Sequence, residues 1–290
     1  MRIICLDGQF VPENEAKVSI FDHGLLYGDG VFEGIRAYNG RVFRLDEHIR
    51  RLYDSARTIM LEIPLSREEY AAQVVETCRR NDIADGYIRA VVTRGVGDLG
   101  LDPRKCPKAS YFIIASSIQL YPERCYEEGL KVITCVTRRN DPTALDPAVK
   151  SLNYLNNILA KIEVNRAGAD EGIMLNQMGF VAEATGDNVF VVHDGRLYTP
   201  PVSAGILVGI TRDAVLDVAR RMQLEIVEQF FTSQFVYNAD ECFLTGTAAE
   251  VIPVVEVDGR RIGGGRPGDI TKRLIAGFHE LVANDGTPIA

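Results

Sequence analysis

Apolar residues recur along most of the chain with helical or strand-like spacing, and polar turns separate these segments. Residues 46–60 carry apolar side chains at intervals of three and four, the spacing of one helix face. Residues 66–82 open with Ser66 and Glu69, the pattern of a capping box, and they also predict a helix. Three further helices are predicted at residues 151–167, 211–223 and 268–284.

Strand-like segments fill the chain between these helices. Residues 1–45 predict short strands separated by turns, and the turn at Asp7-Gly8 is one of them. Further strands are predicted at residues 86–95, 109–121, 130–139, 171–201 and 239–262. Strands and helices mix without the regular alternation of a parallel sheet, so the predicted fold class is α+β in two halves.

A polar stretch at residues 121–129, "YPERCYEEG", follows a long predicted strand and indicates a domain boundary. We expect a smaller N-terminal domain over residues 1–120, a linker over 121–128 and a larger C-terminal domain over 129–290. The length of 290 residues is enough for two such domains with cores of their own.

Composition narrows the possible partners and the location. The formal net charge is −8 and no segment is dominated by Lys and Arg, which argues against a nucleic-acid partner. Six scattered cysteines without a C-x-x-C pair are typical of reduced thiols in the cytosol. We see no signal peptide and no apolar run of the ~18–20 residues that span a bilayer, so a cytoplasmic protein is expected.

Several familiar motifs are only superficially present. Residues 95–100 match G-x-G-x-x-G, but two prolines follow where a dinucleotide site needs a helix, so a loop is predicted. The glycines at 263–265 lack the G-K-[ST] of a P-loop and predict a hairpin turn. The four histidines are far apart without metal-ligand spacing, and no G-x-S-x-G indicates a serine nucleophile. No metal site is expected.

Lys150 is the lysine that stands out, because it lies in the largely apolar stretch "AVKSLNYLNNILAK". Apolar surroundings disfavour an ammonium group, and a neutral amine can attack a carbonyl. On its own, however, a lysine that caps a strand end and reaches water would explain the position equally well.

Four other features suggest what such an amine would serve. Glu183 lies in a small-residue turn between predicted strands, where it could pair with a protonated ring nitrogen. Residues 209–211 open a helix and residues 246–248 form a tight turn, and both offer N–H groups and a hydroxyl to an anion. Arg51 could add a fixed positive charge. Singly these are typical of a solvated turn, a plain helix cap or a surface arginine; together they indicate a pyridoxal phosphate site.

The chain resembles the fold-type IV pyridoxal-phosphate enzymes, and most closely the branched-chain amino acid aminotransferases. The resemblance lies in "FDHGLLYGDGVFEGIRAYNG", "EHIRRLYDSA", "KSLNYLNNILAK", "EATGDNVF", "GITRDAV" and "TGTAAEVIPV", in matching order from about residue 3 to residue 280. It implies a smaller N-terminal domain and a larger C-terminal domain with a barrel-like sheet. It also implies a homo-oligomer, a dimer or larger.

The resemblance further implies roles for individual residues. Lys150 would be the catalytic lysine that bonds the cofactor and moves the substrate proton, and Glu183 would keep the pyridine nitrogen protonated. Tyr154 would contact the phenolic oxygen of the cofactor. The implied cofactor-binding residues are Arg51, Lys150, Tyr154, Glu183, Leu207, Gly209, Ile210, Thr211, Gly246 and Thr247.

By the same resemblance, one pocket takes either an aliphatic side chain or the distal carboxylate of glutamate. Arg89 and the Tyr27 hydroxyl suit the carboxylate, and the Thr247-Ala248 turn suits the α-carboxylate. Tyr121 is a further candidate for the pocket wall. The implied substrate-binding residues are Tyr27, Phe32, Gly34, Arg36, Tyr87, Arg89, Leu99, Gly100, Leu101, Thr247 and Ala248.

The predicted function is therefore transamination of Leu, Ile and Val with 2-oxoglutarate. Stretches such as "VVTRG", "YGDGV" and "KSLN" also resemble D-amino acid aminotransferases, which lack "FEGIR". Aminodeoxychorismate lyase activity, a side activity as an (R)-amine transaminase and a non-catalytic protein that binds a phosphate ligand are further alternatives.

Overall fold

The structure is a computed structural model that describes residues 1–117 and 121–290. Contacts divide the described chain into two compact units. Unit 1 consists of residues 1–117, 149–153 and 282–290, and unit 2 of residues 121–148 and 154–281. The end of the strand predicted at 109–121 falls partly outside the described residues. Within them, no helix has both the length and the apolar character that crossing a membrane requires.

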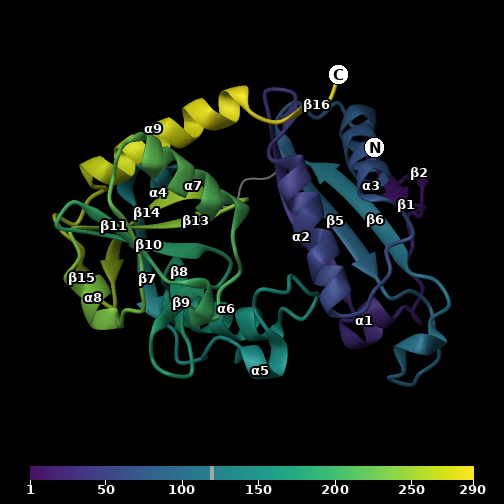
Figure 1. Cartoon of the computed structure of the whole chain (residues 1–290), viewed down its shortest axis with the longest axis horizontal. Helices are drawn as coiled ribbons and strands as arrows, with labels where there is room; N and C mark the ends of the chain where they lie inside the picture. Colours follow the sequence, from purple (N-terminus) through teal and green to yellow (C-terminus); the bar gives the residue numbers. More distant parts are fainter. Residues whose placement is uncertain (118–120) are drawn as a thin grey trace. The chain divides into compact units, whose positions relative to one another are not determined.

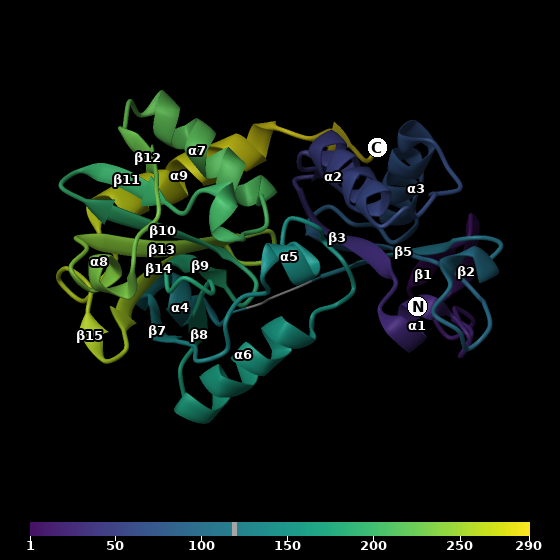
Figure 2. The ribbon, with the colours of Figure 1, turned by 60° about the horizontal axis from the view of Figure 1, so that its bottom comes forward.

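Unit 1 is an antiparallel seven-stranded sheet with two helices packed on one face (Figure 2). Its strands follow the order β16-β4-β3-β5-β6-β1-β2. The strands are β1 (Ile3–Leu6), β2 (Gln9–Pro12), β3 (Gly30–Tyr38), β4 (Arg41–Val42), β5 (Gly86–Thr93), β6 (Ser110–Ser116) and β16 (Thr287–Pro288). The helices are α1 (His23–Tyr27), α2 (Leu45–Thr58) and α3 (Arg67–Arg80), with a 3₁₀ turn at Pro103–Lys105.

The two long helices of unit 1 form for the reasons that the sequence suggests. In α2 the apolar face buries Leu45, Ile49 and Leu52 in the core of the unit. In α3 the predicted capping box is present, because Ser66 and Glu69 exchange side-chain and backbone hydrogen bonds. Helix α1 was not predicted, and it interrupts the run of strands expected over residues 1–45.

Unit 2 is a nine-stranded sheet that curls toward a barrel. Eight strands follow the order β12-β11-β10-β13-β14-β7-β8-β9, and β15 pairs with β14. Strands β9 and β10 lie apart in this order yet contact each other, which requires the sheet to curl. The strands are β7 (Leu130–Thr134), β8 (Glu171–Leu175), β9 (Val181–Ala184), β10 (Asn188–His193), β11 (Arg196–Thr199), β12 (Ile226–Glu228), β13 (Glu241–Gly246), β14 (Glu250–Val257) and β15 (Arg260–Arg261).

Helices flank the curled sheet (Figure 1). Helix α7 packs on β13, and α9 packs on α7, where Gly277 leaves space for Val218. Helix α6 lies against β7 and β8. The helices that start in unit 2 are α4 (Glu123–Glu128), α5 (Pro142–Leu145), α6 (Leu155–Ala167), α7 (Ile210–Arg221), α8 (Ser233–Tyr237) and α9 (Asp269–Asn284), with a 3₁₀ turn at Val202–Ala204.

Two local predictions are wrong in detail. The helix expected from residue 151 begins at Leu155, because residues 149–153 run along the start of β3. There the Phe32 N–H donates to the Lys150 carbonyl at 3.0 Å, and the Leu152 N–H donates to Gly30 at 2.9 Å. The glycines at 263–265 do not form a hairpin turn, since they connect β15 to α9.

Candidate active site

Lys150 is held beside the last turn of α2 and the start of β3, all within unit 1. Its N–H donates to Ser55 Oγ at 3.2 Å, and its carbonyl accepts from Phe32. Its Nζ lies 4.5 Å from the centroid of the Phe32 ring, a cation–π distance. The backbone of Lys150 is thus fixed on both sides, and its side chain lies over an aromatic face.

A buried charge cluster adjoins this position. Glu33 of β3 is inaccessible to solvent, and its two carboxylate oxygens accept from Arg51 Nε at 2.7 Å and Nη2 at 2.8 Å. His48 Nδ1 lies 2.7 Å from Glu33 Oε2. The two-pronged contact fixes the plane of the Arg51 guanidinium on α2.

The protonation states in this cluster follow from burial and charge. Burial alone would raise the pKa of Glu33, but the neighbouring Arg51 and His48 outweigh burial and lower this pKa from 4.5 to about 2. Burial lowers the pKa of His48 against the opposing pull of Glu33. At neutral pH the cluster therefore contains an ionised Glu33 and a neutral His48, which donates its Nδ1 proton to the carboxylate.

Sequence analysis missed Glu33 and His48 as site residues. An acidic residue in the middle of the apolar strand "GVFEGIRAY" was the available signal. A buried carboxylate needs a cation or several donors, so a partner in a neighbouring helix could have been expected.

The predicted substrate residues of β3 and β5 gather on one face of the unit-1 sheet. Gly34 pairs with Arg89, and the Arg89 guanidinium lies 4.5 Å from the Phe32 ring centroid and 5.4 Å from that of Tyr87. A side chain at Gly34 would overlap the Tyr87 hydroxyl, so glycine is required for this ring position. This face combines aromatic surface with one guanidinium.

The remaining predicted substrate residues of unit 1 are Tyr27, residues 99–101 and Arg36, which pairs with Tyr87 across β3 and β5. The Tyr27 hydroxyl donates to the Leu99 carbonyl at 2.5 Å, which ties α1 to the loop of residues 95–102. The side chains of Leu99 and Leu101 are exposed in unit 1, with Gly100 between them. The Arg36 guanidinium lies 4.9 Å from the Tyr38 ring centroid.

In unit 2, Glu183 is buried and firmly held. It lies on β9, so the prediction that places it in a turn is wrong by two residues. Glu183 Oε1 accepts from Arg139 Nε at 2.7 Å, and Oε2 accepts from the Leu207 N–H at 2.9 Å. Arg139 was not predicted as a site residue. Its partner is 44 residues away in the chain, so no local spacing reveals the pair.

The two predicted anion sites of unit 2 flank the start of β10. Helix α7 begins at Ile210 after Gly209, and Thr211 in its first turn is buried. The second site is the turn between β13 and β14, which contains Thr247 and Ala248. Tyr154 directly precedes α6 and is half-buried.

Glycine is required at both anion sites for the same physical reason. A side chain at Gly209 would overlap Asn188 Oδ1, and one at Gly246 would overlap Asp187 Oδ1. Asn188 Nδ2 also donates to the Leu207 carbonyl at 2.9 Å. The turn before β10 thus positions both sites and the segment that binds Glu183.

The donor set in unit 2 fits pyridoxal phosphate. Backbone N–H groups at a helix start suit a phosphate, and a buried carboxylate suits a protonated ring nitrogen. The buried Thr245 hydroxyl, beside Asn188 in the β10–β13 ladder, has no hydrogen-bond partner in the described chain. An orphaned hydroxyl beside these glycines is consistent with a site built for a polar ligand.

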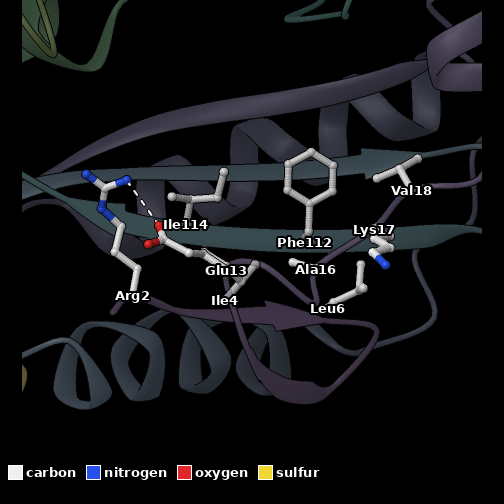
Figure 3. A pocket seen from close by; sticks show the side chains of 9 residues that line it. All are labelled: Arg2, Ile4, Leu6, Glu13, Ala16, Lys17, Val18, Phe112 and Ile114. Carbon is white, nitrogen blue, oxygen red and sulfur yellow. Dashed lines mark hydrogen bonds and ion pairs between the residues drawn. The ribbon is translucent and has the colours of Figure 1, made fainter.

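A hollow of about 260 Å³ lies on unit 1, and none of the predicted site residues lines it, although Ile114 in its lining pairs with Arg89 across β5 and β6 (Figure 3). Ile4, Phe112 and Ile114 form its apolar floor. An exposed ion pair between Arg2 and Glu13, 3.4 Å apart, lies at its rim. Its chemistry differs from that around Lys150 and Glu183.

Comparisons with known proteins agree with this geometry. The sequence pattern of the family described as amino-transferase class IV matches residues 30–257. The putative branched-chain-amino-acid aminotransferase of Methanocaldococcus jannaschii is 56% identical over 278 residues, which cover 96% of each chain. The branched-chain-amino-acid aminotransferase of Pseudomonas aeruginosa is 40% identical, covering 97% of this chain and 93% of the relative.

Solved structures share the fold of this chain over nearly its whole length. The branched-chain amino acid aminotransferase of Escherichia coli superposes with a TM-score of 0.95 at 36% identity, covering 98% of this chain and 96% of that one. The enzyme of the same name from Thermobaculum terrenum, in its PLP-form, gives 0.91 at 32% identity, covering 100% and 98%. The predicted fold type is confirmed, and the chain belongs to the amino-transferase class IV family.

Proposed function

We propose that the protein is a pyridoxal-phosphate-dependent branched-chain amino acid aminotransferase. It would transfer the amino group of L-leucine, L-isoleucine or L-valine to 2-oxoglutarate, which gives a branched-chain 2-oxo acid and L-glutamate. The observation that carries this proposal is Lys150, whose backbone is fixed between β3 and α2 beside the Glu33–Arg51 cluster. The relatives described above, all named branched-chain aminotransferases, support it.

The bound cofactor would supply an electron sink for the charge that develops when the substrate Cα loses its proton. Lys150 Nζ would hold the cofactor and then accept and return that proton. Glu183 would hold the ring nitrogen, because Arg139 and the Leu207 N–H keep its carboxylate in one orientation. Arg51, Thr211 and the 246–248 turn would hold the phosphate.

The pocket chemistry suits two kinds of side chain. Phe32 and Tyr87 offer apolar surface to an aliphatic chain, and Arg89 offers a guanidinium to the distal carboxylate of glutamate. Discrimination among leucine, isoleucine and valine should be modest, since one methylene changes rates by only about 10–200-fold in an apolar pocket.

The first test replaces Lys150. Lys150→Ala should lower the turnover of L-leucine with 2-oxoglutarate by at least about 10³-fold, because both the attachment point and the proton carrier are lost. Lys131→Ala, which removes an exposed lysine on β7, is the matched control and should retain full turnover. Full turnover in Lys150→Ala would refute the proposal.

The visible absorption spectrum of the purified protein, recorded before and after L-leucine or D-alanine is added, separates the alternatives. Bleaching of the cofactor absorption by L-leucine and not by D-alanine is the expected result. Bleaching by D-alanine alone would favour a D-amino acid aminotransferase. Tight phosphate-ligand binding without turnover of any amino acid would favour the non-catalytic alternative.

We also propose that the enzyme is a cytoplasmic homo-oligomer. All six cysteines are free thiols, which suits a reducing compartment. Helix α6 exposes an apolar stripe, in which Leu155 is 67% and Ile158 52% exposed in the single chain. Sedimentation velocity should give at least a dimer, and Ile158→Glu should shift the protein toward the monomer. An unchanged assembly would exclude this stripe as the interface.

A further inference from the structure

An acidic cluster is buried in unit 2 behind the turn that joins β9 to β10. It consists of Glu171 at the start of β8, Asp187 in the turn, and Tyr121 just before α4. All three residues are less than a tenth exposed. The roles assigned above to Lys150, Glu183 and the anion sites use Asp187 only as a neighbour of Gly246 and do not explain why three polar side chains are buried together here.

Glu171 is surrounded by donors. Its Oε1 accepts from the N–H groups of Gly172 at 2.8 Å and Thr185 at 3.2 Å, and from the Thr185 hydroxyl. Its Oε2 accepts from Lys161 Nζ at 2.8 Å and from the Tyr121 hydroxyl at 3.0 Å. These five donors define Glu171 as the ionised member of the cluster.

Asp187 is in the opposite situation. The Tyr121 hydroxyl, which donates to Glu171, lowers the pKa of Asp187, but burial and the charge of Glu171 outweigh this influence. Burial, followed by the negative charge of Glu171, raises the pKa of Asp187 from 3.8 to about 7.

The protonated carboxyl occupies a position that matters for the anion site. Asp187 Oδ1 fills the space in which a side chain of Gly246 would lie, so it supports the start of the 246–248 turn. The turn of Asp187 also leads into Asn188, which contacts Gly209 and Leu207. A change at Asp187 therefore reaches both anion sites.

We propose that Asp187 is a positioning residue that works in its protonated form: buried under Gly246, it holds the 246–248 turn in the shape that binds an anion. This inference rests on the proposed function in one respect, that the anion is the phosphate of the cofactor. Loss of the proton would place a second negative charge beside Glu171 and under the turn.

The charges that face Asp187 set the pH at which this happens. Glu171 on β8 and Glu183 on β9 raise the pKa of Asp187, and Lys161 on α6 and the Tyr121 hydroxyl lower it. Arg139 partly offsets the charge of Glu183. Anion binding should therefore be intact below pH 7 and should weaken as the pH rises through this value.

The test compares the wild type with Asp187→Asn, because an amide keeps the size and the donor of a protonated carboxyl. Calorimetric titration of the full chain, freed of cofactor, with pyridoxamine 5'-phosphate would give the dissociation constant from about pH 6 to pH 9. Between these limits, from about pH 6 to pH 8, the wild type should weaken on the order of tenfold more than Asp187→Asn, because only the protonated fraction binds well. Because the ligand titrates in the same way with both proteins, the ratio of their dissociation constants at each pH removes the effect of ligand protonation.

Asp194→Asn is the matched control, since Asp194 lies exposed in the turn at the other end of β10. It should follow the wild type at every pH. Parallel profiles for wild type and Asp187→Asn, or weaker binding by Asp187→Asn at about pH 6, would overturn the inference and leave the proposed function intact. No binding by any of the proteins would overturn both.

A second measurement uses the wild type alone, so it does not depend on whether a variant folds. The infrared carbonyl stretch of a protonated carboxyl should be present in the wild type at about pH 6 and should disappear by about pH 9. Its absence at the lower pH would show that Asp187 is already ionised, which contradicts the proposal.

Discussion

Glu33 in unit 1 and Asp187 in unit 2 are both buried acids, yet their pKa values move in opposite directions. Burial raises the pKa of each. Glu33 has a guanidinium in two-pronged contact and a histidine beside it, and its pKa falls to about 2. Asp187 has another carboxylate as its neighbour, and its pKa rises to about 7.

The difference shows how a buried acid acquires a role. Where a cation is in contact, the acid stays charged and serves to fix that cation, as Glu33 fixes Arg51. Where the nearest charge is of the same sign, the acid keeps its proton and becomes a donor, as we infer for Asp187. The surrounding charges, and not burial itself, decide between the two.

Removing the charge from Glu33 should have the largest effect. Glu33→Gln leaves the partly buried Arg51 guanidinium without its fully buried carboxylate partner, and breaking a buried pair costs about 3–5 kcal/mol. Urea unfolding monitored by circular dichroism should show this loss. Glu76→Gln on α3, which removes an exposed partner of Arg79 and Arg80, is the control and should change little. A loss of less than about 1 kcal/mol in Glu33→Gln would show that Arg51 is compensated elsewhere.

The two acids should change the free energy of unfolding with pH in opposite directions. The expected size is intermediate, about 1.4 kcal/mol for each unit by which the folded-state pKa differs from the unfolded one. The folded-state pKa of Glu33 is lowered, so its contribution is present above pH 4.5 and is lost as the pH falls toward 2. The folded-state pKa of Asp187 is raised, so its contribution is present below about pH 4 and is lost as the pH rises through 7.

Thermal unfolding of the variants should therefore diverge from the wild type at opposite ends of the pH scale. Glu33→Gln should approach wild-type stability at acid pH, where Glu33 takes up its proton. Asp187→Asn should match the wild type near pH 4 and exceed it near pH 8. The same sign of pH dependence in both variants would contradict the comparison.

The sequence could predict the elements whose signals are local. The capping box of α3 and the apolar face of α2 depend only on residues three or four positions apart in the sequence. Both are present in the structure. The start of α6 was predicted too early, because the pairing of residues 149–153 with the start of β3 is a contact between distant segments. Local propensity contains no information about such pairing.

The candidate site also contains residues that local motifs reveal and residues that only contacts between distant segments reveal. Lys150 and Glu183 can be predicted as site residues from the sequence because their neighbours form characteristic motifs. The partners that orient the site, Arg139 for Glu183 and Glu33 for Arg51, come from other elements and belong to no motif. Asp187 lies inside "EATGDNVF", but its proton depends on Tyr121 and Glu171, which no spacing connects to it.

The smallest expected effect, and the sharpest test of the comparison, comes from Lys161. Its ammonium donates to Glu171, but its side chain is 38% exposed, so Lys161→Met should cost less than about 1 kcal/mol. Removing this cation should nevertheless raise the pKa of Asp187, because Lys161 lowers it in the wild type. The infrared midpoint of the protonated carboxyl should therefore move to higher pH while stability hardly changes. A midpoint that stays in place or falls would mean that Asp187 does not sense the charges around Glu171, and the raised pKa of Asp187 would then be a result of burial alone.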